Sequence, residues 1–200
     1  MLTFTTSQWV PYPVELVFAF FANPSNLPHL TPKWRQARVE SMRLLPAPAR
    51  PVAEDPTLRF QSPAAGVGTE VMLSMRLISG LPFRTSWLAR IAEFAWNDHF
   101  EDEQLKGPFA AWRHTHRIVR EEQRGEQGET GETDEARLDE RRIDGTRITD
   151  ELAYQMPLGP LGSMAHELFV RRQIEESFAF RQQRLLKILP VAARQAAQRQ

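Results

Sequence analysis

The sequence predicts an α+β fold in which a curved antiparallel β-sheet of about six to seven strands wraps around one long C-terminal α-helix. The first observation is a stretch without Gly or Pro that begins at Ser163 and ends before Pro190. The second is that much of the preceding chain alternates apolar and polar residues, as half-buried strands do. A helix of about 40 Å needs a broad apolar partner, and the strands can supply one.

The C-terminal helix is expected over residues 161–189, with Ser163 as its cap and Pro190 as its stop signal. One apolar stripe with steps of four, four, seven and four residues consists of Val170, Ile174, Phe178, Leu185 and Leu189. The charged residues between them, including Arg181 and Arg184, are assigned to the solvent face. The stripe predicts the surface that packs on the sheet.

The remaining elements follow from alternation and from Pro and Gly punctuation. Strands are expected over residues 2–10, 38–45, 69–78, 83–96, 100–105, 109–120 and 146–156. Two short helices follow the first strand, one from Pro13 to the stop at Asn23-Pro24 and one over residues 25–30. Asn97-Asp98 suits a hairpin turn. These elements predict a single domain over residues 1–200.

Two stretches interrupt this pattern. Residues 46–68 contain five prolines and are expected to form an irregular surface excursion. Residues 121–140 contain nine acidic residues against two arginines, which predicts a mobile, solvated hairpin loop.

Composition excludes several functional classes. The 25 basic and 25 acidic residues cancel, which argues against nucleic acid as the main partner. The chain has no cysteine, so disulfides, thiol nucleophiles and zinc–thiolate sites are excluded. The N-terminus has no signal-peptide pattern, and no apolar run approaches the roughly 20 residues of a membrane span. We therefore expect a soluble cytoplasmic protein, with an oligomeric state that the sequence does not indicate.

Strand parity predicts a polar cluster on the inner face of the sheet. Arg113 and Arg117 should face water, which turns the intervening Trp112, His114 and His116 inward. The same parity on the two neighbouring strands adds further inward polar side chains: Asp102, Gln104, Asp150 and Tyr154. Because buried polar groups are costly unless they are paired, so many of them indicate a partly polar cavity.

Three roles remain open for the two histidines. Each can simply satisfy a buried carboxylate, which is the most common role of a histidine on a strand. His114 and His116 with Asp102 or Asp150 also have the residue types of a metal site, although the spacing of the two histidines is weak evidence for one. A His–Asp pair can also act as an acid or base, since the carboxylate orients the imidazole. We expect no metal and no cofactor.

The order of elements and several short motifs resemble the SRPBCC superfamily (START-like, helix-grip fold), and within it the bacterial polyketide cyclase/dehydrase-like group. The residues that carry the resemblance form three blocks: 11–21 with Asn23-Pro24 and Asn26-Leu27; 100–104 with Gly107-Pro108-Phe109, Trp112, His114 and His116; and 149–151 with Tyr154, Pro157, Gly159 and Leu161-Gly162. These blocks span nearly the whole chain, whereas residues 46–68 and 121–140 exceed what the family needs.

The resemblance implies a deep cavity between the sheet and the C-terminal helix that holds an apolar or amphipathic small molecule. Leu73, Trp112, Ile174 and Phe178 would form its apolar wall. The expected ligand-binding residues are Asp102, Gln104, Trp112, His114, His116, Asp150, Tyr154 and Phe178.

Three functions follow as hypotheses. The first is a carrier or binding protein without chemistry. The second is a cyclase or dehydratase on a polyketide-like substrate, with His114 or His116 as the catalytic base. The third is a protein-interaction module that uses the Arg-rich outer face of the last helix.

Overall fold

A computed structural model describes residues 1–53, 55–59, 62–77, 82–124, 142–157 and 169–197 of the chain. The strands are β1 (Leu2–Val10), β2 (Arg38–Arg43), β3 (Glu70–Arg76), β4 (Arg84–Ala95), β5 (His99–Lys106), β6 (Ala111–Arg124) and β7 (Arg142–Gln155). The helices are α1 (Val14–Phe21), the 3₁₀ helices η1 (Pro24–Leu30), η2 (Lys33–Arg35) and η3 (Pro56–Leu58), and α3 (Arg171–Ala197).

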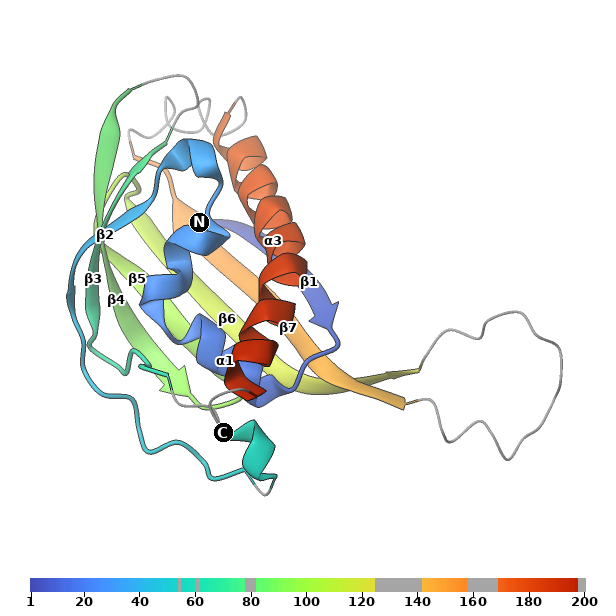
Figure 1. Ribbon diagram of the computed structural model, residues 1–200. Coiled ribbons are helices and arrows are strands. Elements are labelled where there is room, and N and C mark those ends of the chain that lie inside the picture. The colour runs from blue at the N-terminus through green and yellow to red at the C-terminus, as the bar shows by residue number, and fades with distance from the viewer. Residues whose placement is uncertain (54, 60–61, 78–81, 125–141, 158–168, 198–200) are drawn as a thin grey trace, which may run out of the picture.

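Within the described residues, these strands form one antiparallel sheet in the order β1-β7-β6-β5-β4-β3-β2. The sheet curves, and α3 lies across its concave side together with α1 and η1 (Figure 1). This arrangement confirms the α+β helix-grip expectation, including the two short helices after the first strand.

The side-chain pattern explains why α3 packs where it does. Ile174, Phe178, Leu185 and Leu189 are buried, so the apolar stripe faces the sheet as expected. The C-terminal half of α3 joins the core around α1, where Leu185 and Leu189 pack in one cluster with the fully buried Phe18. Farther along the same face, Ile174 and Phe178 pack with Leu152 and Tyr154 of β7.

The expected end of the last helix is wrong. Helix α3 continues through Pro190 to Ala197 rather than stopping at Leu189. A proline inside a helix loses one hydrogen bond, at a cost of about 3 kcal/mol, but the residues after it are mostly good helix formers. The expected start of this helix, over residues 161–168, lies outside the described residues.

The boundaries of the acidic hairpin also differ from the expectation. Strand β6 continues to Arg124 and β7 begins at Arg142, so residues 121–124 are paired strand and not loop. Arg147 pairs with Glu121, and Arg120 with Asp144, 2.8 Å from Nε to Oδ1. These cross-strand charge pairs support a two-stranded ribbon of strongly polar sequence. Residues 125–141 lie outside the described part of the chain.

The Pro-rich stretch is irregular, as expected, but its far end is packed. Ala65 is buried and its N–H donates to the carbonyl of Ala22, just after α1. Gly66 lies so close to the chain that an added Cβ would stand 2.2 Å from the carbonyl oxygen of Pro46. The far end of this stretch therefore packs against the chain that follows α1 and against its own beginning at Pro46. In the described part of the chain, no helix is long and apolar enough to cross a membrane.

Candidate functional site

A cavity of about 610 Å³ lies between the concave face of the sheet, α3 and the short helices. Most of its wall is apolar: Phe20, Phe21, Leu27, Leu30, Val71, Leu73, Met75, Trp87, Ile91, Phe100, Phe109, Trp112, Val170, Ile174 and Phe178 are among its lining residues. The polar part of the lining is Asn23, Asn26, Thr31, Arg35, Asp102, His114, His116, Gln173, Ser177 and Arg181. The cavity is thus apolar with a few polar side chains directed into it.

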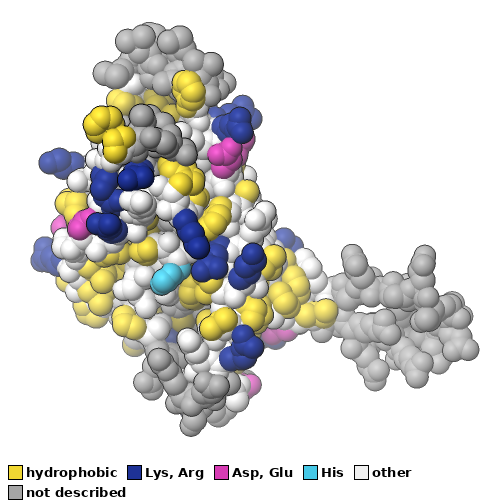
Figure 2. Space-filling view, turned by 45° about the horizontal axis from the view of Figure 1, so that its top comes forward, with side chains coloured by type: hydrophobic (Ala, Val, Ile, Leu, Met, Phe, Trp, Pro, Cys, Tyr) yellow, Lys and Arg dark blue, Asp and Glu magenta, His cyan; other side chains and the backbone are white. Residues whose placement is uncertain are grey.

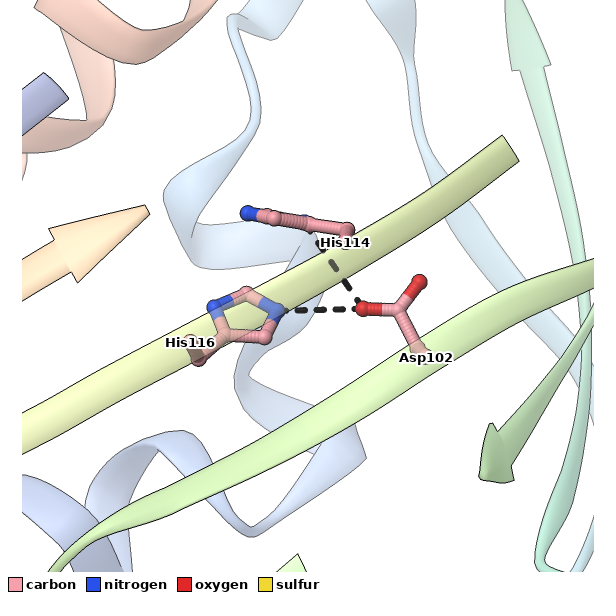
Figure 3. Close-up of side chains that lie close together, drawn as sticks. All are labelled: Asp102, His114 and His116. Atoms are coloured by element: carbon pink, nitrogen blue, oxygen red, sulfur yellow. Dashed lines mark hydrogen bonds and ion pairs between the residues drawn. The ribbon is translucent and has the colours of Figure 1, made fainter. Parts of the chain in front are cut away.

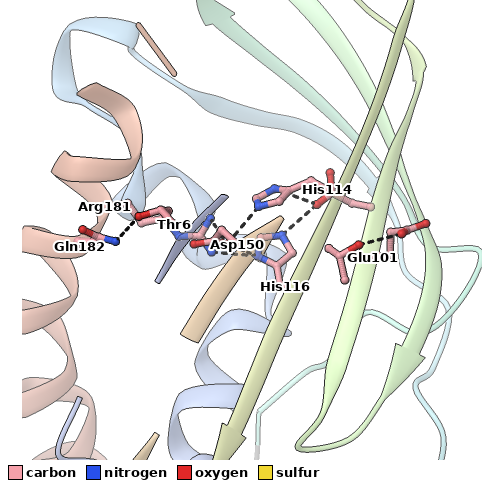
Figure 4. A network of polar contacts seen from close by, with 9 residues as sticks. Thr6, Glu101, His114, His116, Asp150, Arg181 and Gln182 are labelled. Atoms are coloured by element: carbon pink, nitrogen blue, oxygen red, sulfur yellow. Dashed lines mark hydrogen bonds and ion pairs between the residues drawn. The ribbon is translucent and has the colours of Figure 1, made fainter. Parts of the chain in front are cut away.

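Strand register brings four of the expected polar residues together. Asp102 of β5 is directly opposite His114 of β6, and His116 of β6 is directly opposite Asp150 of β7. Because His114 and His116 are two residues apart, both side chains project from the same face of the sheet. The result is a compact group on the neighbouring strands β5, β6 and β7 (Figures 3 and 4).

Contacts within this group run between directly opposite residues, with His116 Nδ1 3.0 Å from Asp150 Oδ1, and also diagonally. His114 Nε2 lies 3.1 Å from Asp150 Oδ1, and His116 Nε2 lies 3.0 Å from Asp102 Oδ2. The two imidazole rings are 3.8 Å apart between centroids, and His116 also stacks on Phe100 at 4.3 Å. Packing and hydrogen bonds together fix both rings.

Arg181 completes the group from the opposite side of the cavity. Its Nη1 lies 3.2 Å from Asp150 Oδ1, and its Nη2 donates to His116 Nδ1 at 3.0 Å (Figure 4). The guanidinium also lies over the ring of Phe21, 4.6 Å from its centroid. The assignment of Arg181 to the solvent face is therefore wrong, since only 12% of this side chain is exposed.

A signal for Arg181 was present in the sequence. The apolar stripe steps by seven residues between Phe178 and Leu185, and Arg181, three residues after Phe178, fills the inward position in that gap. The helical pattern alone assigns a charged residue to the solvent face by default. Here Asp150 provides a buried partner for the charge of Arg181.

The cluster shifts the pKa values of its members. Burial alone would raise the pKa of Asp150, but the charge of Arg181 and the hydrogen bonds from the histidines hold it well below 3.8. For Asp102, burial would likewise raise the pKa, but the hydrogen bond from His116 and the charge of nearby Arg181 help to hold it below its usual value. Burial, followed by the neighbouring His116, lowers the pKa of His114 below 6.5. Both carboxylates are therefore charged, and His114 is neutral, at neutral pH.

The hydrogen-bond partners bear on the tautomers of the two rings. His116 Nε2 lies 3.0 Å from Asp102 Oδ2, and its Nδ1 has two neighbours at 3.0 Å, Arg181 Nη2 and Asp150 Oδ1. His114 donates from Nε2 to Asp150, which leaves the lone pair of Nδ1 available. That nitrogen lies 3.7 Å from Asp102 Oδ2, beyond hydrogen-bond distance, and His114 lines the cavity.

The contacts of the two histidines also bear on whether this cluster could hold a metal ion. Asp102, His114 and His116 offer three ligand atoms within 4.8 Å of one another, a spacing that one ion could span (Figure 3). However, His116 Nε2 and Asp102 Oδ2 already contact each other at 3.0 Å, and a metal would have to replace that contact. A guanidinium this close to the ligands also opposes a second cation. The donor set does not fit a metal well.

The other expected site residues occupy three kinds of position. Trp112 and Phe178 line the cavity beside the cluster, and Phe178 meets His114 edge-on at 5.4 Å. Tyr154 is buried behind them in the core, with Trp112 6.0 Å away. Gln104 donates its amide N–H to the carbonyl of Phe109, at the β5–β6 turn. Asp150, Tyr154 and Gln104 are not among the residues that line the cavity.

The fold and this site together define a class: a helix-grip domain with a ligand-sized cavity between the sheet and the last helix. The chain belongs to the polyketide cyclase/dehydrase and lipid transport family of the SRPBCC superfamily, because the family model matches residues 10–179. No curated protein matches the sequence.

The solved structures that are similar to the chain include the following two. TTHA0849 from Thermus thermophilus has a TM-score of 0.56 and 16% sequence identity, with 96% of this chain and 99% of that chain covered. The ginseng major latex-like protein 151 from Panax ginseng has a TM-score of 0.44 and 12% identity, with 88% and 95% covered. At 16% identity, the likeness to TTHA0849 concerns the fold alone.

Proposed function

We propose that the protein binds an apolar or amphipathic small molecule in the cavity between the sheet and α3, as a carrier or binding protein. The observation that carries this proposal is the cavity itself: about 610 Å³, with mostly apolar walls and a fixed polar cluster on one side. This volume is within the range of cavities that bind drug-sized ligands, and the mixture of apolar and polar lining residues is typical of small-molecule sites.

The polar cluster would orient the bound molecule. His114 Nδ1 is a hydrogen-bond acceptor at the cavity wall, held in place by Asp150 behind the ring. A ligand hydroxyl can donate to it while the apolar part packs between Leu73, Trp112 and Phe178. Because the rings are already fixed, binding costs little side-chain entropy at this end.

A cavity-filling variant tests this proposal. Ala89 of β4 lines the cavity, so Ala89→Phe should place a ring inside it and weaken binding of a neutral environment-sensitive dye such as Nile red by about tenfold or more. Ala179→Phe, on the exposed side of α3, is the matched control and should bind normally. Equal dye binding by both variants and the unmodified protein would count against a ligand in this cavity.

The free lone pair of His114 supports a second function, a cyclase or dehydratase on a polyketide-like substrate. A neutral imidazole with its other nitrogen on a carboxylate can accept a proton from a substrate. Burial keeps the pKa of His114 below 6.5, so the ring is in the accepting form at neutral pH. Ligand orientation and general-base catalysis use the same nitrogen, and turnover of a bound substrate is what separates them.

A further inference from the structure

We infer that Arg35 binds the anionic head group of the ligand, which makes the ligand an anionic amphiphile: an apolar body that ends in a carboxylate or phosphate ester. This inference rests on the proposed function and specifies its ligand class. Arg35 belongs to η2, outside the polar cluster on β5, β6 and β7, and it lines the same cavity.

The Arg35 side chain is fixed across the cavity wall onto α3. Its Nη2 donates to Ser177 Oγ at 3.0 Å and lies 3.4 Å from the carbonyl oxygen of Gln173. The guanidinium also lies over the ring of Trp34, 4.7 Å from the centroid. The chain turns immediately after Arg35, where Gln36 has a φ of 47°. The cation is thus held in one place before any ligand arrives.

This guanidinium lacks the counter-charge that its position calls for. Among the described residues, no carboxylate oxygen lies within 4.0 Å of it. Its Nε is shielded from solvent and has no hydrogen-bond partner in the described part of the chain. A partly buried arginine that bonds only to a hydroxyl and a carbonyl oxygen has donors to spare, and guanidinium donors match an oxyanion in charge and shape.

The other cavity arginine is different, because Arg181 is already neutralised. It pairs with Asp150, and the negatively charged Asp102 belongs to the same polar cluster, 3.0 Å from His116. An anion placed there would face Asp102. Arg35 reaches α3 at Ser177, one helical turn (about 6 Å) from Arg181, so a head group at Arg35 avoids that repulsion.

Burial supports the same assignment. Desolvation lowers the pKa of Arg35 from its usual 12.5, and the more distant charge of Glu176 only partly offsets this effect. Glu176 is itself paired with Arg172 at 2.7 Å. A desolvated cation gains more from an added anion than an exposed one does. In Figure 2, Lys and Arg side chains lie among hydrophobic ones on the face that is drawn, with fewer Asp and Glu side chains.

Four ligands with the same twelve-carbon tail test the inference: laurate, dodecyl phosphate, dodecanol and dodecyltrimethylammonium. Calorimetric titration of the unmodified protein should show the two anions binding at least about tenfold more tightly than dodecanol, and the cation binding weakest. Higher salt should weaken the binding of the two anions and leave the binding of dodecanol unchanged. A preference for only one anion would identify the head group as carboxylate or as phosphate ester.

Arg35→Gln should lower the affinity for laurate and dodecyl phosphate about ten- to a hundredfold. Its affinity for dodecanol should stay within about twofold of that of the unmodified protein. Arg35→Lys keeps the charge and should retain much of the anion preference. The control is Arg172→Gln on α3, where the side chain is 81% exposed. This variant should bind each of the four ligands as the unmodified protein does.

Equal binding of all four ligands, or an Arg35→Gln variant with unchanged laurate affinity, would overturn the inference and leave the proposed function standing. The head-group preference of the unmodified protein decides even if Arg35→Gln does not fold. Failure of all four ligands to bind would instead overturn the proposed function, and the inference with it.

Discussion

Arg181 of α3 and Asp150 of β7 form an ion pair, 3.2 Å from Nη1 to Oδ1, that connects the last helix to the second strand of the sheet. Both side chains are largely buried, with 12% and 5% exposed. Gln182 adds a second tie, since its amide donates to Thr6 Oγ1 of β1 at 2.9 Å (Figure 4). The helix position that defines one wall of the cavity therefore depends on polar contacts as well as on the apolar stripe.

Removal of the Arg181 charge should destabilise the fold. We expect Arg181→Met to lower the free energy of unfolding by about 3 kcal/mol or more, because Asp150 would be left buried without its strongest neutralising partner. The exposed Arg172→Met should cost less than about 1 kcal/mol. Urea unfolding at pH 7.5 measures both. Adding Asp150→Asn to Arg181→Met should recover part of the loss, and equal costs for the two single variants would contradict a structural ion pair.

Stability should fall as the pH falls below about 6.5. The folded-state pKa of His114 is lowered from 6.5, so the unfolded chain takes up this proton at a higher pH than the folded one. The contribution of this group is therefore fully present above 6.5 and is lost as the pH falls toward the folded-state pKa. Asp150, also lowered, adds a second loss as the pH falls below 3.8. Urea unfolding from pH 8 to 4 should show a smaller decline between pH 6.5 and 5 in His114→Gln than in the unmodified protein. Parallel curves would mean that His114 does not carry the effect.

His114→Gln also separates the roles left open for this residue. If Nδ1 orients the ligand, affinity for a ligand that donates a hydrogen bond should fall by about 1–3 kcal/mol, while dodecane-like tails without a donor are unaffected. If Nδ1 is a catalytic base, turnover of a substrate should instead fall by about 10²–10⁴ while binding survives. We expect the first result. Unchanged affinity and a loss of stability alone would leave His114 as a structural partner of Asp150.

The acidic hairpin should be replaceable without loss of the fold. Arg124 and Arg142 are directly paired across β6 and β7, so a two-residue Asn-Gly turn can join them in place of residues 125–141. Loop-closure entropy changes slowly with length, so thermal stability should stay about the same or rise slightly. Thermal unfolding followed by circular dichroism checks this, and loss of soluble protein would show that residues 125–141 are needed.

Strand parity was the most informative part of the sequence. Because Arg113 and Arg117 alternate with Trp112, His114 and His116, the inward face of β6 could be assigned without a structure, and the neighbouring strands followed by the same rule. Parity does not specify which inward polar groups reach a cavity and which lie behind it. Tyr154 faces inward but is buried in the core, and the amide of Gln104 donates a hydrogen bond to the main-chain carbonyl of Phe109.

Long-range charge pairing was the main feature that the sequence did not predict. Arg181 and Asp150 are 31 residues apart, and only the packing of α3 on β7 brings them within 3.2 Å. Arg35 has no local pattern at all, since its position depends on η2 turning back toward Ser177. Pro190 misled for a similar reason: it is a strong local stop signal, but the helix-forming residues after it extend α3 to Ala197.

Native mass spectrometry of the purified protein tests the central claim most directly. We expect the unmodified protein to carry a small-molecule adduct, or to take up one equivalent of laurate or dodecanol, and Ala89→Phe to lose that adduct. Ala179→Phe should retain it. A bare mass for the unmodified protein that persists after incubation with both ligands would contradict a ligand-binding cavity between the sheet and α3.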